Sequence, residues 1–250
     1  MRLALGAMLF FSLDGVAASA PLRFVVPDTW AMPMVQLEHG RPTQGILYDM
    51  MLSLATQVGA PAEFHVLPRG RVQAAMEHGD VDVRCYVTRS WLPEQSGDYS
   101  WSIPLFAQSD LLISRHFPAP PVNPASLPAQ SIGTVLGYRY PLLQPLFDAG
   151  RLLRDDARNQ QQVLDKLMAG RNQYAVSNQW SLDWFNQRLL PQRQMQAVAV
   201  LQEYNLGCYV RNDPQVPVQR ILDTLAQMKT SGEIEDIIRL YIGDEPKPTP

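Results

Sequence analysis

The sequence lacks the short motifs that mark most catalytic centres. Its two cysteines, Cys85 and Cys208, form no C-x-x-C pair, and its four histidines are dispersed without the spacing of metal ligands. It contains no nucleophile elbow, no P-loop and no dinucleotide-binding glycine fingerprint. We therefore expect no metal, no cofactor and no enzymatic activity.

The sequence also lacks a basic region. Its formal net charge is −3 at pH 7, and its Lys and Arg residues are scattered singly. Because binding to nucleic acid needs clustered positive charge, we expect no nucleic-acid partner. With 46% hydrophobic and 18% charged residues, the composition is that of a globular protein and excludes a disordered chain.

The only long apolar run lies at the N-terminus, over residues 3–13, after Arg2 and before small residues at 15–20. It is shorter than the roughly 20 apolar residues that span a bilayer, which favours a cleavable signal peptide at 1–20 over a membrane anchor. Cleavage after Ala20 and cleavage after Ala18 are both consistent with the small residues. We predict a periplasmic protein, whose two cysteines are candidates for a disulfide, with two buried free thiols as the alternative.

Two segments far apart in the chain share one pattern, an amphipathic helix that ends at a glycine and leads into a strand. They cover 71–87, with Gly79 at the turn, and 160–178, with Gly170 at the turn. With strands expected at 23–26 and 64–67 and a helix between them, the first third of the mature chain has the order β-α-β-α-β. The pattern predicts two α/β lobes with a ligand cleft between them.

The rest of the chain supplies few candidates for chemistry. Residues between the first strand and its helix are expected to form a polar loop, and the prolines of 117–128 exclude a helix there. The neighbouring acids Asp155 and Asp156, like those at 233–236, are expected on solvated helix faces. No catalytic carboxylate pair is therefore indicated.

Aromatic residues are plentiful, with five tryptophans and nine tyrosines. Several lie in predicted loops or at strand ends, where they suit stacking on a small ligand, although core packing is the alternative for each. These are Trp30, Tyr86, Trp91, Trp101, Tyr138 and Tyr140. Trp180 and Trp184, four residues apart, are expected to pack within a helix.

Six short strings lie along the chain in a characteristic order. They are GILYDMMLSLATQVG at 45–59, a G-x-x-D turn at 79–82, YSWSIPLF at 99–106, GTVLGYRY at 133–140, LMAGRNQYAVSN at 167–178 and KTSGEIEDIIRLY at 229–241. In this order they resemble the extracellular solute-binding proteins of family 3, the amino-acid-type periplasmic binding proteins. The resemblance implies a periplasmic binding protein type II-like fold, in which two α/β lobes joined by a two-strand hinge close on a ligand. It places lobe 1 at 21–104 and 201–245, lobe 2 at 105–200 and a flexible tail at 246–250.

Two departures from the family bear on the ligand. Members that bind amino acids hold the ligand carboxylate with an arginine and its ammonium with an acid, and these positions match Trp91 and Asn178 here. Each unsatisfied group would cost about 1–3 kcal/mol in a dry cleft, so a standard α-amino acid is doubtful and another small polar or aromatic solute is expected. The candidates to hold an anion instead are Arg69, Arg84, Arg89 and Arg139.

The resemblance also implies the ligand-binding residues. We expect Trp30, Tyr86, Thr88 and Trp91 from the first lobe, and Gly137, Tyr138, Arg139 and Asn178 from the second. It sets Cys85 and Cys208 on adjacent antiparallel strands, which implies a disulfide between them.

The same resemblance implies the partners. We expect a monomer that captures a small-molecule ligand and presents it to the permease of an ABC-type transporter. One alternative is a sensory module that signals to a partner receptor. The other is an exported enzyme similar to cyclohexadienyl dehydratases, which needs a cleft carboxylate, and Asp49 and Asp110 are equally suited to structural roles.

Overall fold

The computed structural model describes residues 19–92, 97–116 and 118–243. The predicted signal peptide, apart from its last two residues, and the predicted tail at 246–250 lie outside the described residues. Within the described ranges no helix has the length and apolar character needed to span a membrane.

The first lobe begins with the predicted alternation of strands and helices. Its elements are β1 (Leu22–Pro27), α1 (Ile46–Val58), β4 (Ala62–Leu67), η1 (Arg69–Arg71), α2 (Val72–His78) and β5 (Val83–Val87). Strand β1 pairs in parallel with β4 and β5. Helix α2 ends at Gly79, whose φ of 78° lies in the left-handed region that glycine adopts without strain. The predicted β-α-β-α-β order is confirmed.

One prediction in this lobe is wrong. The polar loop expected between β1 and α1 contains a two-stranded antiparallel hairpin of β2 (Gln36–Glu38) and β3 (Arg41–Gln44). The side chains of Gln44, Gln36 and Glu38 are joined by hydrogen bonds on it. The strands are short, and Leu37 and Pro42, which pair with each other, are their only apolar residues, so they lack the apolar alternation by which a strand is detected.

The second lobe contains the second helix-glycine-strand unit. Its elements are β7 (Phe106–Ser114), η3 (Pro124–Ser126), β8 (Gln130–Val135), α3 (Gln144–Asp148), β9 (Leu152–Ala157), α4 (Gln160–Met168), β10 (Tyr174–Asn178), α5 (Gln179–Asn186) and η4 (Pro191–Arg193). Helix α4 leads through Gly170, with φ 73°, into β10 as predicted. In place of the expected helix face, Asp155 and Asp156 lie on β9, where Lys166 and Arg154 pair with them.

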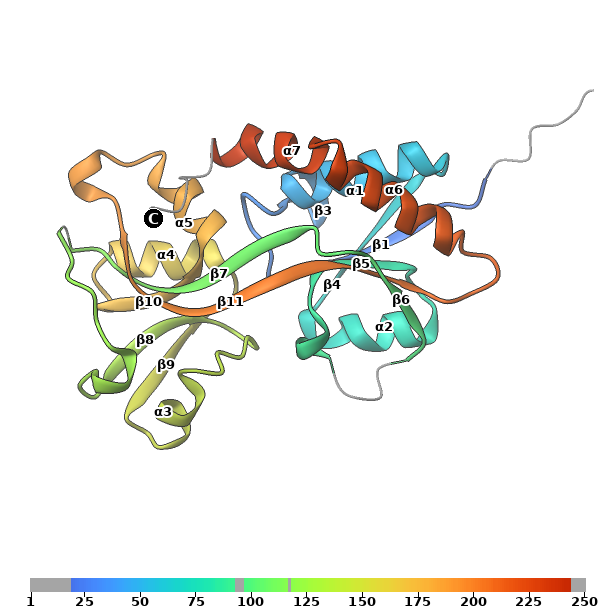
Figure 1. The fold of residues 1–250 in the computed structure, drawn as a ribbon. Coiled ribbons are helices and arrows are strands. Elements are labelled where there is room, and N and C mark those ends of the chain that lie inside the picture. The colour runs from blue at the N-terminus through green and yellow to red at the C-terminus, as the bar shows by residue number, and fades with distance from the viewer. Residues whose placement is uncertain (1–18, 93–96, 117, 244–250) are drawn as a thin grey trace, which may run out of the picture.

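Two long strands join the lobes (Figure 1). Strand β7 runs antiparallel to β11 (Gln196–Arg211), and β11 continues into the first lobe to pair with β5 and with β6 (Tyr99–Trp101). The sheet order is therefore β4-β1-β5-β11-β7-β10-β8-β9, with β6 on β11. The predicted lobe boundaries after residues 104 and 200 fall beside β7 and within β11.

Each lobe has an apolar core on both faces of its sheet. In the first lobe, α1, α6 (Val218–Thr230) and α7 (Glu233–Ile242) cover one face and α2 covers the other (Figure 1). In the second lobe, α4 and α5 cover one face and the α3 region covers the other. Trp180 of α5 crosses this division, because its ring packs in the core of the first lobe.

The implied disulfide is confirmed. Cys85 of β5 lies opposite Cys208 of β11, and their sulfur atoms are bonded. Both residues are fully buried, so the bond ties the outgoing and returning passages of the chain together inside the first lobe.

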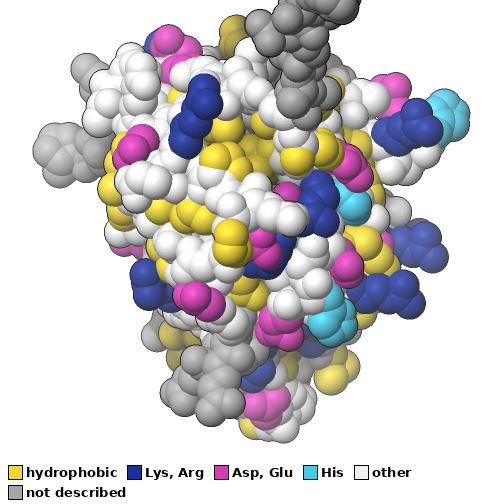
Figure 2. Space-filling model, turned by 90° about the vertical axis from the view of Figure 1, so that its right-hand side faces the viewer, with side chains coloured by type: hydrophobic (Ala, Val, Ile, Leu, Met, Phe, Trp, Pro, Cys, Tyr) yellow, Lys and Arg dark blue, Asp and Glu magenta, His cyan; other side chains and the backbone are white. Residues whose placement is uncertain are grey.

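The outer end of the first lobe carries mixed charge. On the face drawn in Figure 2, basic and acidic side chains are interspersed with apolar ones, and neither sign forms a continuous patch. This face therefore offers no broad electrostatic surface for a polyanion.

Candidate functional site

A cavity of about 960 Å³ lies between the lobes and is partly open to solvent. Its walls come from the segment after β1, the ends of β5 and β10, the loop after β8, and the crossing strands β7 and β11. The structure brings all eight predicted ligand residues to this cavity: Trp30, Tyr86, Thr88, Trp91, Gly137, Tyr138, Arg139 and Asn178. Their contact with a ligand stays a prediction.

The wall from the first lobe is mainly aromatic. Tyr86 has a backbone φ of 58°, which a non-glycine residue rarely adopts and which costs about 1–3 kcal/mol. Its ring packs edge to face with Trp30 at 6.2 Å between centroids, and lies 5.6 Å from Trp180. Burial and the nearby Asp110 raise the pKa of the Tyr86 phenol well above its ordinary value, so this hydroxyl stays neutral.

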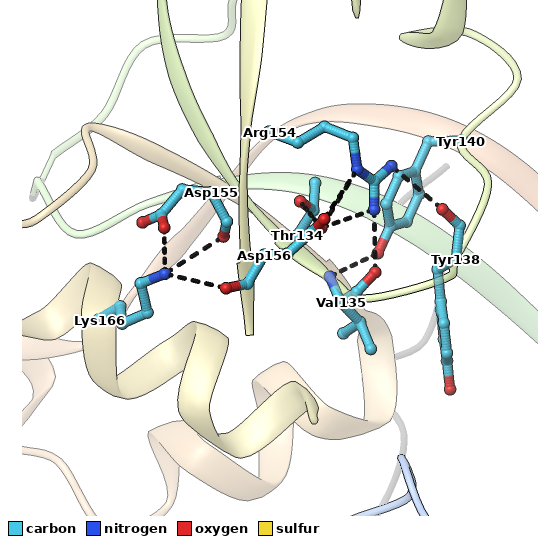
Figure 3. A network of polar contacts seen from close by, with 8 residues as sticks. All are labelled: Thr134, Val135, Tyr138, Tyr140, Arg154, Asp155, Asp156 and Lys166. Atoms are coloured by element: carbon cyan, nitrogen blue, oxygen red, sulfur yellow. Dashed lines mark hydrogen bonds and ion pairs between the residues drawn. The ribbon is translucent and has the colours of Figure 1, made fainter. Parts of the chain in front are cut away.

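The wall from the second lobe is a loop that one arginine holds in place. Arg154 donates hydrogen bonds to the carbonyl oxygens of Val135 at 3.0 Å and Tyr138 at 3.1 Å, and it pairs with Asp156 at 2.8 Å. The Val135 N–H donates to the hydroxyl of Tyr140 at 3.2 Å. The Tyr138 side chain extends away from this network (Figure 3). The loop therefore presents Tyr138 from a rigid base.

Tyr138 connects the lobes across the cavity. Its hydroxyl lies 3.4 Å from Oγ1 of Thr29, in the segment after β1. The guanidinium of Arg69, also from the first lobe, lies 4.3 Å from the centroid of its ring, within the range of a cation–π interaction. The described conformation is therefore one in which the two lobes touch.

Asn178 has a structural contact as well as a place in the cavity wall. It is the last residue of β10 and the N-cap of α5, where its Oδ1 accepts a hydrogen bond from the Ser181 N–H at 2.9 Å. This contact satisfies one of the otherwise unpaired donors at the start of the helix. The amide group therefore adds no charge for a ligand ammonium.

The floor of the cavity contains Gln108 and Tyr204, which the sequence analysis missed, beside the candidate acid Asp110. Gln108 and Asp110 point to the same side of β7, and Tyr204 of β11 lies opposite Gln108. Gln108 is 5% exposed, and neither atom of its side-chain amide has a hydrogen-bond partner among the described residues. The signal that could have revealed Gln108 is its place two residues before Asp110, in the polar triplet 108–110 of the otherwise apolar run PLFAQSDLLI.

Asp110 is a partly buried carboxyl on the cavity floor. Burial raises its pKa to about 6, and a hydrogen bond with the Tyr204 hydroxyl opposes the rise. Burial and the charge of Asp110 in turn raise the pKa of Tyr204 to about 12. Asp110 therefore changes its protonation near neutral pH, in contact with a neutral phenol.

The candidate arginines separate into two groups. Arg69, Arg84 and Arg139 line the cavity, whereas Arg89 lies outside it with its guanidinium 5.0 Å from the ring centroid of Trp101.

Two aromatic candidates are also outside the lining. Trp101 packs on Tyr209 and Tyr140 is buried in the second lobe. Of the two candidate acids, Asp110 lines the cavity, and Asp49 instead accepts a hydrogen bond from Tyr241. Among the described residues, no group of three or more His, Cys, Asp or Glu side chains is placed to hold a metal.

Sequence comparison gives no relative, because no family model and no curated protein matches the chain. Its structure is similar to many solved ones. An ancestral arginine-binding protein bound to arginine is 18% identical, with a TM-score of 0.70 over 91% of this chain and 100% of that one. The GluR0 ligand-binding core in complex with L-glutamate is 15% identical, with a TM-score of 0.71 over the same shares of the two chains.

A third similar structure is that of a precursor of an enzyme. It is the ancestral amino-acid-binding protein AncCDT-1, a precursor of cyclohexadienyl dehydratase, 17% identical with a TM-score of 0.68 over 89% of this chain and 95% of that one. At these identities the likeness shows the fold. The chain has the fold of the type II periplasmic binding proteins, and the predicted structural resemblance to amino-acid-type binding proteins is confirmed.

Proposed function

We propose that this protein is an exported solute-binding protein that captures a small polar or aromatic solute between its lobes. The observation that carries the proposal is a cavity lined from both lobes and from both crossing strands. Five aromatic side chains in its lining, from Trp30, Tyr86, Trp91, Tyr138 and Tyr204, supply flat apolar surface for the ligand.

Capture proceeds by hinge closure. The lobes are connected through β7 and β11, whose pairing between Phe106 and Asp110 lies at the floor of the cavity. A ligand that contacts Trp91 on one side and Tyr138 on the other favours the closed state by the contacts that the open state cannot make. The contact of Tyr138 with Thr29 would favour the same state.

Thermal denaturation with and without candidate solutes tests this proposal. A ligand at one hundred times its dissociation constant should stabilise the protein by about 2.7 kcal/mol. The double variant Trp91→Ala/Tyr138→Ala should lose that stabilisation, while Trp101→Ala, an aromatic residue outside the cavity lining, should keep it. Full retention by the double variant would place the ligand elsewhere.

The partner of the loaded protein depends on its predicted export to the periplasm. We propose that the closed protein acts in the periplasm as a monomer and docks on a membrane permease of the ABC type. A receptor that reads the same closure is the alternative partner. Binding of the loaded protein to the permease or sensor encoded beside its gene distinguishes the two roles.

A second function, catalysis on the same scaffold, is favoured by one observation. Asp110 is a cavity carboxyl whose pKa, raised by burial to about 6, suits general acid chemistry near neutral pH. Prolonged incubation with a bound solute, followed by product analysis, is the test. Turnover that is lost in Asp110→Asn would establish the enzyme, and unchanged solute would exclude it for that compound.

A further inference from the structure

Three arginines line the cavity without a carboxylate partner. Arg69 and Arg84 come from the first lobe and Arg139 from the second. Across the described parts of the chain, ion pairs within 4.0 Å involve other basic residues, and none of these three takes part in one. The cavity therefore holds positive charge that the protein itself does not neutralise.

Arg84 is the strongest of the three because it is buried. It is 8% exposed, and its side-chain hydrogen bond goes to the neutral hydroxyl of Tyr209 at 3.4 Å. The Tyr209 hydroxyl in turn donates to Gln73 at 3.1 Å. A buried guanidinium loses favourable hydration, and Tyr209 supplies no countercharge, since it offers only this long hydrogen bond and a ring whose centroid lies 5.9 Å away. An anionic ligand would supply the missing countercharge.

Gln108 indicates a polar group in the ligand by an independent route. Its buried amide offers a donor and an acceptor to the cavity, and neither has a partner in the described chain. Buried polar groups are satisfied in most structures, so an orphan amide in a cavity wall indicates a group supplied by a ligand. A carboxylate oxygen can accept a hydrogen bond from the amide N–H, beside the stronger one from a guanidinium.

The acids of the cavity do not balance the arginines. Glu203 lies exposed at the cavity edge, and Asp110 is the carboxyl whose charge burial disfavours. Even with both carboxyls ionised, the lining carries three arginines against two acids. The lining as a whole is therefore suited to negative charge in the ligand.

We infer that the solute is a small organic acid whose carboxylate is held by Arg84, with the aromatic wall contacting its carbon skeleton. This inference rests on the proposed function and names its substrate class. It places the residue that binds the anion within β5, seven positions before Trp91. The positive charge of Arg139 is then available to a further acidic group of the ligand.

Two series of probes test this inference, and within each series the carbon skeleton stays similar while the charge is negative, neutral or positive. Thermal denaturation is measured with benzoate, benzamide and benzylamine, and with succinate, succinamide and 1,4-diaminobutane, with inorganic phosphate as a separate oxyanion. Stabilisation by an acid, without stabilisation by its amide or amine, is the expected result. Stabilisation by phosphate alone, or by no acid, overturns the organic-acid assignment. Stabilisation by an amine or amide alone also overturns it while leaving solute capture intact.

Variants at two arginines complete the test. Arg84→Met should weaken binding of the acid by at least about 10-fold, the effect of losing a charged hydrogen bond. Arg89→Met, which alters an arginine outside the cavity lining, should leave the affinity unchanged. The ligand-free Arg84→Met protein should also melt at a higher temperature, because it no longer buries an uncompensated charge. A lower melting temperature would show that Arg84 is a structural residue and overturn the inference.

Discussion

Replacing Asp110 by asparagine should stabilise the ligand-free protein at neutral pH and not in acid. The pKa of this carboxyl is about 6 in the folded protein, against an ordinary value of 3.8, because burial disfavours its charge. A difference of about two units corresponds to about 3 kcal/mol, and partial exposure of the side chain reduces this to about 1–3 kcal/mol.

The sign follows from proton binding. Between pH 4 and 6 the folded protein holds a proton on Asp110 that the unfolded chain has released. The wild-type protein therefore loses stability as pH rises through this window. The asparagine side chain of the variant cannot ionise, so the stability of the variant relative to wild type should increase from pH 4 to pH 6 and then remain constant.

Urea unfolding of both proteins at intervals between pH 4 and 8 measures this difference, in which the contributions of other groups cancel. Asp148→Asn is the matched control, since that side chain lies exposed on α3. A difference that stays flat across the pH range, or that falls as pH rises, would refute the view that burial disfavours the charge of Asp110.

Three further outcomes can be checked on the same protein. The double variant Cys85→Ala/Cys208→Ala, which opens a bond across 123 residues, should lose about 2–5 kcal/mol in urea unfolding, and an unchanged unfolding free energy would contradict the bond. Gly45→Ala should lose at least about 2 kcal/mol, because φ is 127° and the new Cβ would lie 2.4 Å from the Met34 carbonyl oxygen; Gly40→Ala, with open space around it, should lose less. Arg154→Gln should weaken solute binding several-fold while circular dichroism shows an intact fold, and wild-type affinity would exclude its role in holding the loop before Tyr140.

Local sequence patterns were sufficient to predict most of the fold. Helix periodicity closed by Gly79 and Gly170 gave both helix-to-strand units, because a left-handed residue ends a helix wherever the chain goes next. The same patterns failed at β9, because its sequence LLRDDA has three consecutive charged residues and no alternation of apolar and polar residues. Ion pairs to Arg154 and Lys166 satisfy its acids, and such partners are invisible before the strands are assembled.

The residues of the candidate site also fall into those that local sequence could predict and those that it could not. Tyr86 and Asn178 stand at the ends of strands, and ligands in layered α/β folds lie beyond strand ends, so their convergence on one cavity could be predicted from order alone. Gln108, Asp110 and Tyr204 lie in the middle of the crossing strands. Their access to the cavity depends on the register between β7 and β11, which pairs residues almost a hundred positions apart and has no local signal.

The position of these floor residues has a consequence for how recognition and closure are coupled. The side chains at strand ends belong to one lobe or the other, and a ligand that touches only one lobe leaves the open and closed states equally stable. Gln108 and Asp110 belong to the connection itself, so in the proposed hinge closure a ligand that contacts them would be held close to the hinge. Arg84 and Tyr138 would then supply contacts on the two sides, and the ligand would favour closure to the extent that it reaches both.

If Arg84 sets the specificity for charge and Tyr138 sets the extent of closure, the two properties should be separable by mutation. An Arg84 variant should lose affinity for the acid, whereas Tyr138→Ala should retain weak binding and lose the compaction that small-angle X-ray scattering measures on ligand addition. Compaction that survives in Tyr138→Ala would show that closure is driven from the floor alone.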